Sequence, residues 1–301
     1  MGDKLMSEAF RVRPGAKLRL KDHDPAWDRI HEIKGLGKEN AATKADSFLK
    51  KSLKELASAQ ELLWASDTCS VLMVLQAMDA AGKDGIIEHV MSGMNPQGCQ
   101  VYSFKRPSDE ELDHSFLWRC MKVLPERGRI GIFNRSYYEE VLVVKVHQEL
   151  LERQKLPPGK RDKSFWKDRF TDINAFEKHI ARNGTVIVKF FLHISKKEQR
   201  ERFLARLEDP RKQWKFSLAD LEERKYWDEY MDAYEDALEE TSTEWAPWYV
   251  IPADHKWIAR AAVASILTDT INSLNLAFPR IHDDQGKILA RAKKELESEK
   301  D

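Results

Sequence analysis

The sequence predicts an α/β fold in which helices cover both faces of a five-stranded parallel sheet. Short continuous apolar runs are typical of strands that are buried on both faces. Five such runs occur, around residues 71–75, 101–104, 130–133, 185–192 and 248–251. The stretches between them have the length of helices, and strands that alternate with helices form βαβ units with parallel strands.

The other segments divide the chain into an arm, one domain and a tail. Residues 1–44 are mostly polar, with interspersed proline and glycine, so we expect an extended arm. The domain spans residues 45–285; it begins with a helix whose apolar residues recur every three or four positions, and its last helix starts near Asp254. Residues 286–301 are highly charged and are expected to form a frayed tail.

The composition excludes several classes of protein. The chain has 301 residues with 50 Lys plus Arg and 50 Asp plus Glu, so its formal net charge is zero. A disordered chain would lack apolar residues, but 42% of the residues are hydrophobic and nine are Trp, which suffices for a core. A general nucleic-acid binder would carry a basic surplus, so we expect no nucleic-acid partner.

The sequence shows no targeting or membrane segment. No apolar stretch approaches the ~20 residues that span a bilayer, and the first thirty residues contain no apolar signal region. The cysteines Cys69, Cys99 and Cys120 are widely spaced and match neither a disulfide framework nor a CxxC pattern. We therefore expect free thiols, a cytoplasmic location and no membrane partner.

A phosphate-binding loop is predicted where the first strand ends. The segment from Gln76 to Gly85 follows that strand and precedes a helix, which is the context of a P-loop. Backbone N–H groups and the helix N-terminus would hold phosphate oxygens there, and Lys83 would add a positive charge. The predicted phosphate-binding residues are Ala81, Gly82, Lys83, Asp84 and Gly85.

This loop departs from the pattern GxxxxGK(S/T), because Ala77 replaces the first glycine and Asp84 the Ser or Thr. Asp79 and Asp84 place carboxylates beside the lysine, which suits phosphate binding through metal ions. Acidic residues also occur at helix starts because they interact with the helix dipole. The alternative is an ordinary strand–turn–helix in which Gly82 serves only the backbone geometry.

A second polar motif follows the third strand, in residues 130–140. Asn134 occupies the place of the acidic residue in a Walker B element. Arg135 could stabilise a transferring phosphoryl group, and Glu139 could bind a metal ion or orient the acceptor. The alternative is structural, with Ser136 as a helix N-cap and Glu139 as its capping-box partner.

A basic segment follows the fourth strand and its helix. Residues 202–215 contain five cations, and Asp209-Pro210 is predicted to end the helix. Basic runs are often only a solvated face, but a mobile basic lid at this place would close over phosphates and exclude water. Residues 217–220 then resemble a capping box that opens a long helix.

Taken in order, the segments MDAAGKDG, FNRSYYEE and RLEDPRKQWKFS resemble the polyphosphate kinase 2 family, over about residues 45–275. The resemblance implies a P-loop kinase-like three-layer α/β/α sandwich with a helical lid at about 206–240. It also implies Mg²⁺-dependent phosphoryl transfer, with Mn²⁺ as an alternative ion, between inorganic polyphosphate and nucleotides. Members of the family are usually dimers or tetramers, so a homo-oligomer is expected.

The resemblance also implies roles for individual residues. Asp79 would bind Mg²⁺ or activate the acceptor phosphate, Lys83 would be the phosphate-loop lysine, and Arg135 the second-motif arginine. Together with Glu139 they form the predicted catalytic set. The lid cations implied to face polyphosphate or nucleotide are Arg206, Arg211, Lys212 and Lys215.

Asn134 is the main departure from the family pattern, because many members have Asp there. It shifts the expected metal ligands to Asp79, with Glu139 as a partner. The combination of Asn134 with Glu139 resembles the subgroup of the family that accepts both nucleoside mono- and diphosphates. The expected nucleotides are therefore AMP, GMP, ADP and GDP, with ATP and GTP as the corresponding triphosphates.

Two other functions remain open. A P-loop kinase that transfers phosphate from ATP to a nucleoside or another small molecule fits the phosphate loop equally well. A non-catalytic relative that binds polyanions fits the substitutions Asn134 and Ala77. Four aromatic residues could stack on a base or pack in the core, namely Phe104, Trp118, Tyr137 and Tyr138.

Overall fold

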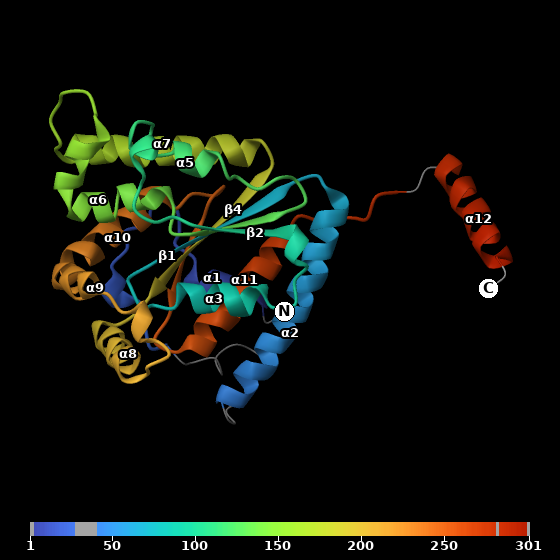
Figure 1. Cartoon of the computed structure of the whole chain (residues 1–301), viewed down its shortest axis with the longest axis horizontal. Coiled ribbons are helices and arrows are strands. Elements are labelled where there is room, and N and C mark those ends of the chain that lie inside the picture. Colours follow the sequence, from blue (N-terminus) through green and yellow to red (C-terminus); the bar gives the residue numbers. More distant parts are fainter. Residues whose placement is uncertain (1–2, 28–40, 281–282, 300–301) are drawn as a thin grey trace.

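The computed structural model describes residues 3–27, 41–280 and 283–299. Its centre is a sheet of five parallel strands in the order β2-β3-β1-β4-β5 (Figure 1). Each predicted apolar run forms one strand, which confirms the predicted sheet. The strands are β1 (Ser70–Ala77), β2 (Cys99–Ser103), β3 (Ile130–Asn134), β4 (Thr185–His193) and β5 (Trp248–Pro252).

Helices cover both faces of the sheet, which confirms the predicted three-layer sandwich (Figure 1). On one face, α11 (Lys256–Asn272) packs against α2 (Ala41–Ser66) and α3 (Lys83–Met91). On the other face, α7 (Lys163–Arg182) packs against β4 and α10 (Trp227–Thr241). The other helices are α1 (Asp3–Phe10), α4 (Asp109–Leu112), α5 (Trp118–Met121), α6 (Val143–Val146), α8 (Lys196–Glu208), α9 (Leu218–Glu223) and α12 (Asp283–Ser298), and the 3₁₀ turns are η1 (Leu20–Asp22), η3 (Pro96–Gly98), η4 (Tyr137–Glu140), η5 (Gln148–Gln154), η6 (Gln213–Lys215) and η7 (Arg224–Tyr226).

Burial in the sheet follows the position of each strand. All residues of β1 are buried because β3 and β4 pair with its two edges and helices cover its two faces. β2 is an edge strand, and its Val101 is 46% exposed. The loop that follows β1 is therefore anchored at the centre of the sheet.

The N-terminal segment differs from the predicted extended arm. Residues 3–10 form α1, which packs against α11, and η1 follows at residues 20–22. The side chains of Phe10, Val12 and Leu20 are buried, and the Val12 N–H donates to the carbonyl of Trp248 at 2.9 Å. The prediction of an extended arm is wrong for this part because its few apolar residues join the main core. Residues 28–40 of the predicted arm lie outside the described residues.

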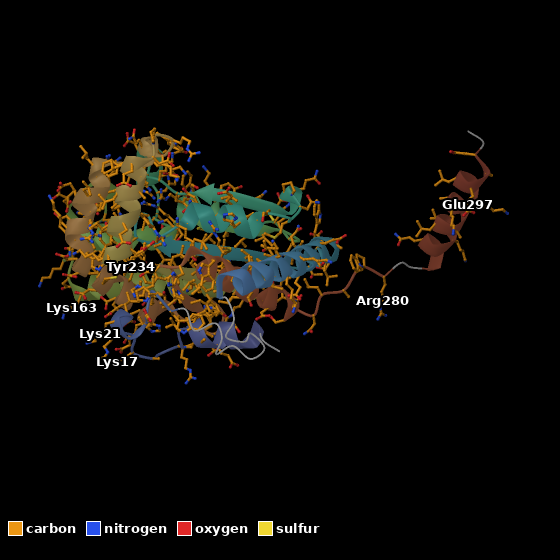
Figure 2. All side chains as sticks on the ribbon, turned by 90° about the horizontal axis from the view of Figure 1, so that it is seen from below. Lys17, Lys21, Lys163, Tyr234, Arg280 and Glu297 are labelled. Atoms are coloured by element: carbon orange, nitrogen blue, oxygen red, sulfur yellow. The ribbon has the colours of Figure 1, made fainter. Side chains whose placement is uncertain are left out.

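The charged C-terminal tail forms the regular helix α12, so the prediction of a frayed tail is wrong. Two ion pairs stabilise this helix, and in each the partners are four residues, about one turn, apart. They are Arg291–Glu295 at 2.9 Å and Lys293–Glu297 at 3.7 Å. Figure 2 shows Glu297 apart from the domain. In the parts of the chain that the structure describes, no helix is both long and apolar enough to cross a bilayer.

The predicted lid, residues 206–240, consists of two different parts. Ser217 caps α9 through a backbone N–H of its first turn, at 3.2 Å, but this helix has only six residues and η7 follows it. From Trp227 onward the chain forms α10, whose inner face, including Tyr234, is buried in the core. We therefore restrict the name lid segment to residues 206–226, since α10 belongs to the body of the domain.

Burial of His193, at the end of β4, predicts stability that is lost in acid. Burial, with a smaller contribution from His23, lowers the pKa of His193 from 6.5 to about 4. Between these values the unfolded chain binds a proton that the folded chain does not. The free energy of unfolding should therefore fall as the pH drops from 6.5 to 4, by about 3 kcal/mol in total.

Urea denaturation at several pH values measures this effect. His193→Gln should reduce the loss of stability between pH 6.5 and 4, whereas the exposed His114→Gln should leave it unchanged. An unchanged pH dependence in His193→Gln would show that other groups cause the acid sensitivity.

Candidate active site

The three predicted motifs meet at the carboxyl edge of the sheet. Leu75 of β1 pairs with Asn134 of β3, so the loops after these strands are neighbours. A cavity of about 990 Å³ opens at this edge, between the two loops, the lid segment and α11. The predicted site residues that line it are Asp79, Ala81, Gly82, Lys83, Asp84, Gly85, Arg135, Arg206, Lys212 and Lys215.

The loop between β1 and α3 has a conformation suited to anion binding. Ala80 (φ 62°) and Gly82 (φ 109°) both have left-handed backbone, which turns the chain sharply from strand to helix. Gly82 is the N-cap of α3, and no described side chain caps this first turn, so its N–H groups are available to a phosphate. Ala77 is extended in β1, which explains why the first glycine of the P-loop pattern is not required.

The Lys83 side chain folds back over this loop. Its Nζ donates to the carbonyl oxygens of Ala77 at 2.9 Å and Met78 at 3.5 Å. Desolvation lowers the pKa of Lys83, and the Arg135 guanidinium lowers it further, against the opposing effect of Asp79. A bound anion would therefore stabilise the charged form of this lysine.

Arg135 lies between two carboxylates. Its Nη2 donates to Asp79 Oδ1 at 3.0 Å, and its Nη1 donates to Glu139 Oε2 at 3.2 Å. Glu139 raises the pKa of Arg135 most strongly, so the guanidinium is firmly charged. Arg135 has a left-handed backbone (φ 63°), a strained conformation that is often found at functional sites. Its side chain is thereby held at the cavity.

Glu139 does not line the cavity. Its carboxylate pairs with the guanidinium of Arg135, with Oε2 3.2 Å from Nη1. The role of Glu139 as a metal ligand stays a prediction, and the observed contact places its carboxylate beside the guanidinium of Arg135.

Oxygen atoms suited to a divalent cation gather at the two strand ends. Asp79 and Asp84 line the cavity, and Asn134 Nδ2 donates to Asp84 Oδ1 at 3.0 Å. Asn134 Oδ1 is buried without a hydrogen-bond partner among the described residues. Mg²⁺ takes oxygen ligands and commonly uses one or two carboxylates together with substrate phosphates and water. These residues fit that donor set, whereas the described residues contain no cluster of three or more His, Cys, Asp or Glu that could hold a metal ion alone.

The lid segment supplies cations to the cavity. Arg206, Lys212 and Lys215 line it, as predicted. Arg211 does not: its side chain is 88% exposed and its Nε lies 3.2 Å from Asp209 Oδ1. Its guanidinium is instead bound to the carboxylate of Asp209, two residues earlier, through Nε and Nη2.

Sequence reasoning missed several charged residues that line the cavity. Lys105 and Arg106 lie two and three residues after the end of β2, and their position directly after the predicted strand 101–104 was a usable signal. Lys256 and Arg260 lie on α11, far along the chain, and only the fold brings them to the site. With these and Arg202, ten cations and four acids line the cavity, which therefore favours polyanions.

Arg202 of α8 clamps the phosphate loop to the opposite wall. Its Nη1 donates to the carbonyl oxygens of Ala80 at 3.0 Å and Ala81 at 2.9 Å. Its Nη2 donates to those of Ala253 at 2.6 Å and Asp254 at 2.9 Å. Sequence reasoning counted this residue among the cations of the basic segment 202–215 and did not predict its burial. The clamp ties the carbonyl oxygens of Ala80 and Ala81 to those of Ala253 and Asp254 through one guanidinium.

We expect Arg202→Met to lower the free energy of unfolding by about 3–5 kcal/mol, because it leaves buried carbonyls and Glu198 without their charged partner. Urea denaturation measures the loss. Arg200→Met on the same helix is the matched control, since Arg200 is exposed. Equal stability of the two variants would contradict a clamping role.

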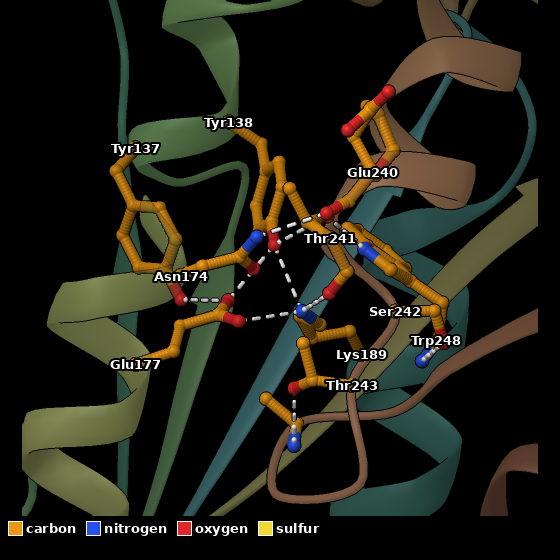
Figure 3. A network of polar contacts seen from close by, with 12 residues as sticks. Tyr137, Tyr138, Asn174, Glu177, Lys189, Glu240, Thr241, Ser242, Thr243 and Trp248 are labelled. Carbon is orange, nitrogen blue, oxygen red and sulfur yellow. Dashed lines mark hydrogen bonds and ion pairs between the residues drawn. The ribbon is translucent and has the colours of Figure 1, made fainter. Parts of the chain in front are cut away.

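A buried polar network contacts Tyr137 and Tyr138 of the second motif, residues 130–140 (Figure 3). Lys189 Nζ donates to Glu177 Oε2 at 2.6 Å and to the carbonyl of Thr241 at 2.8 Å. The hydroxyls of Tyr137 and Tyr138 each donate to Glu177 Oε1 at 2.8 Å. Burial lowers the pKa of Lys189 to about 8. The two tyrosines are thus core residues that anchor the chain after Arg135.

The structural alternative for the second motif is confirmed in part. Ser136 Oγ accepts from the Tyr138 N–H at 3.1 Å, so Ser136 is an N-cap. Glu139 pairs with Arg135 and not with Ser136, which excludes a capping box. Trp118 stacks on His114 at 3.9 Å between ring centroids and does not line the cavity.

A parallel sheet, whose central strand leads through a sharp left-handed turn into a helix beside a basic cavity, defines a P-loop kinase-like fold. A model of the family described as polyphosphate kinase 2 matches residues 39–279. The chain belongs to this polyphosphate kinase 2 family, which confirms the resemblance seen in its three motifs.

Two relatives and one solved structure are similar over nearly the whole chain. The "ADP-polyphosphate phosphotransferase" of Rhodopseudomonas palustris is 51% identical, over 97% of this chain and 99% of its own. The "AMP/ADP-polyphosphate phosphotransferase" of Meiothermus ruber is 45% identical, over 93% and 98%. The crystal structure of polyphosphate kinase 2 from Arthrobacter aurescens has a TM-score of 0.85 and 41% identity, with 96% of each chain covered.

Proposed function

We propose that this protein transfers phosphoryl groups between inorganic polyphosphate and nucleotides. The observation that carries the proposal is the cavity, where Lys83 and Arg135 meet a surplus of cations at a phosphate loop. Such a cavity suits a reaction that brings two phosphate polyanions together, because Coulomb repulsion between them is the main barrier to their approach. The names of the two relatives support the same substrate classes.

In the proposed reaction, an oxygen of the nucleotide's terminal phosphate attacks the terminal phosphorus of polyphosphate. The bond to the bridging oxygen of the chain breaks, and the shortened polyphosphate leaves with that electron pair. The loop N–H groups and Lys83 hold the transferring group, and Arg135 stabilises its equatorial charge. Closure of the lid segment would bring Arg206, Lys212 and Lys215, which line the cavity, onto the phosphates and exclude water. No covalent intermediate with the protein is needed.

We further propose that Mg²⁺, or Mn²⁺ in its place, is the cofactor. Asp79, Asp84 and the free Oδ1 of Asn134 would hold it. When bound, the ion neutralises phosphate charge and orients the phosphate oxygens. Asp84 and Asn134 replace the predicted ligand Glu139 in this assignment.

The proposed acceptors are nucleoside mono- and diphosphates, with AMP, GMP, ADP and GDP as candidates and ATP or GTP as the triphosphates. One relative is named for ADP and the other for both AMP and ADP. The test offers each of these four nucleotides as acceptor, with polyphosphate as the sole phosphoryl donor and with Mg²⁺ present. Product from ADP or AMP is the expected result, and no product from any acceptor would refute the proposal.

The same assay separates the two alternatives. A P-loop kinase that uses ATP would ignore polyphosphate and phosphorylate a nucleoside or small molecule. A non-catalytic relative would bind polyphosphate with strong salt dependence and form no product.

We propose a cytoplasmic location and a homo-oligomeric state, a dimer or a tetramer. The location is supported by Cys69, Cys99 and Cys120, which are all free thiols. The oligomeric state stays a prediction from the family resemblance, and light scattering on a size-exclusion column would measure it.

A further inference from the structure

Trp214 stands out in the cavity because it is a large aromatic residue among charged ones. It lies in the lid segment, lines the cavity and is 77% exposed. Phe104 is the other aromatic residue among the described lining residues, and it is only 9% exposed because it packs against Phe133. Trp214 is therefore the aromatic surface that a ligand in this cavity would meet.

The indole of Trp214 is held in place before any ligand binds. It belongs to η6, and its Nε1–H donates to the carbonyl of Arg211 at 3.0 Å. Lys215 Nζ lies over the ring, 5.1 Å from its centroid. The turn itself is closed by the N–H of Lys212, which donates to the carbonyl of Asp209 at 2.8 Å. With the lysine over one face and most of the residue exposed, the ring can accept a second planar group.

The chemistry of an indole face selects a base and not a phosphate. The face of an aromatic ring is electron-rich, so it attracts cations and flat π-systems and repels phosphate oxygens. Lid cations alone would serve a phosphate chain, and a tryptophan among them adds nothing to that interaction. A nucleotide, by contrast, combines phosphates with a flat base.

We propose that Trp214 is the stacking platform for the base of the nucleotide, an inference that rests on the proposed function. The cavity volume of about 990 Å³ exceeds what a few phosphates need and suits a complete nucleotide together with the end of a phosphate chain. Stacking is tolerant of base identity because every base has a π-face. The platform would therefore serve adenine and guanine nucleotides alike, as the proposed acceptors require.

The test compares Trp214→Ala and Trp214→Phe with the wild type in steady-state kinetics. In Trp214→Ala, KM for ADP and for GDP should each rise by about 5- to 100-fold, the usual effect of losing one stacked aromatic. KM for polyphosphate should stay within about twofold, because its contacts are made by cations. Trp214→Phe keeps a π-face and should restore most of the nucleotide affinity.

Trp245→Ala is the matched control. Trp245 is also a partly exposed tryptophan, 36% exposed, with Lys178 Nζ over its ring at 4.8 Å, but it does not line the cavity. Its replacement should change neither KM. This control removes general effects of losing a surface tryptophan.

Calorimetric binding of ADP without polyphosphate gives a readout besides activity. ADP affinity should fall in Trp214→Ala by the same factor as KM rises, while the affinity for tripolyphosphate, which has no base, should not change. Unchanged ADP affinity, or a loss of tripolyphosphate affinity instead, would overturn the proposal. A fall in kcat alone would also overturn it, since that result assigns Trp214 to lid closure.

Failure of the stacking role is distinguishable from failure of the proposed function. If the wild type forms no nucleotide product from polyphosphate, the proposed function fails, whatever the variants do. If the wild type forms product and Trp214→Ala matches it in both KM values, only the stacking role fails.

Discussion

Lys83→Ala is expected to lower kcat/KM for phosphoryl transfer from polyphosphate by about 100- to 1,000-fold, the usual effect of removing one preorganised electrostatic group. Lys83 Nζ already lies over the phosphate loop, where it donates to the carbonyl of Ala77 at 2.9 Å. Its charge is therefore in place before the transition state forms and needs no reorganisation during the reaction. The effect should appear mainly in kcat, because the transferring group gains charge contacts in the transition state.

The control for this prediction is Lys197→Ala, which removes an exposed lysine on α8 that does not line the cavity. Rates for both variants are measured with saturating ADP and Mg²⁺ over a range of polyphosphate concentrations. A near-normal rate in Lys83→Ala would show that the phosphate loop is not the reaction centre.

The parts of the site that sequence predicts are those whose position follows from a single strand. Arg135 comes directly after β3, and Lys83 follows β1 after one short loop. The carboxyl ends of parallel strands share one edge of a sheet. Lys256 and Arg260 carry no such signal, because they lie on a helix more than 170 residues beyond the loop that they face. Their place depends on the packing of α11 against α3, which is a tertiary contact.

The local sequence did not predict burial for residues that lie in polar or charged stretches. Arg202 is one cation in a basic run, yet its guanidinium satisfies four backbone carbonyls inside the domain. The N-terminal segment is mostly polar in sequence, yet its Phe10 and Val12 are buried in the core. In both cases tertiary partners, which no local pattern records, decide the burial.

The balanced net charge of the chain is compatible with a polyanion site because the charges are separated in space. Cations outnumber acids at the cavity, and the opposite sign must prevail elsewhere, since the total is zero. A local positive field of this kind attracts a phosphate chain, but it does not make the surface as a whole bind nucleic acid non-specifically.

Asp79→Asn is the variant that best separates an enzyme from a binding protein with the same fold. Asp79 lines the cavity, and its Oδ1 accepts from Arg135 Nη2 at 3.0 Å. If the protein is the proposed phosphotransferase, the amide can neither hold the cation nor orient Arg135 as a carboxylate does, and turnover should fall by about 100-fold or more. If the protein only binds polyanions, the loss of one negative charge should leave binding intact or strengthen it.

Asp220→Asn supplies the matched control, because Asp220 lines the same cavity and carries the same charge but lies 3.9 Å from Arg206 in the lid segment. Both variants change the net charge of the cavity equally, so a difference between them reflects the position of Asp79 and not the general field. We expect Asp220→Asn to keep turnover within about fivefold of the wild type, because its ion pair with Arg206 is long and therefore weak. Polyphosphate binding is measured for both variants at two salt concentrations. Equal turnover in the two variants would argue against a catalytic role for Asp79, and it would return the choice of metal ligands to Asp84 and Asn134 alone.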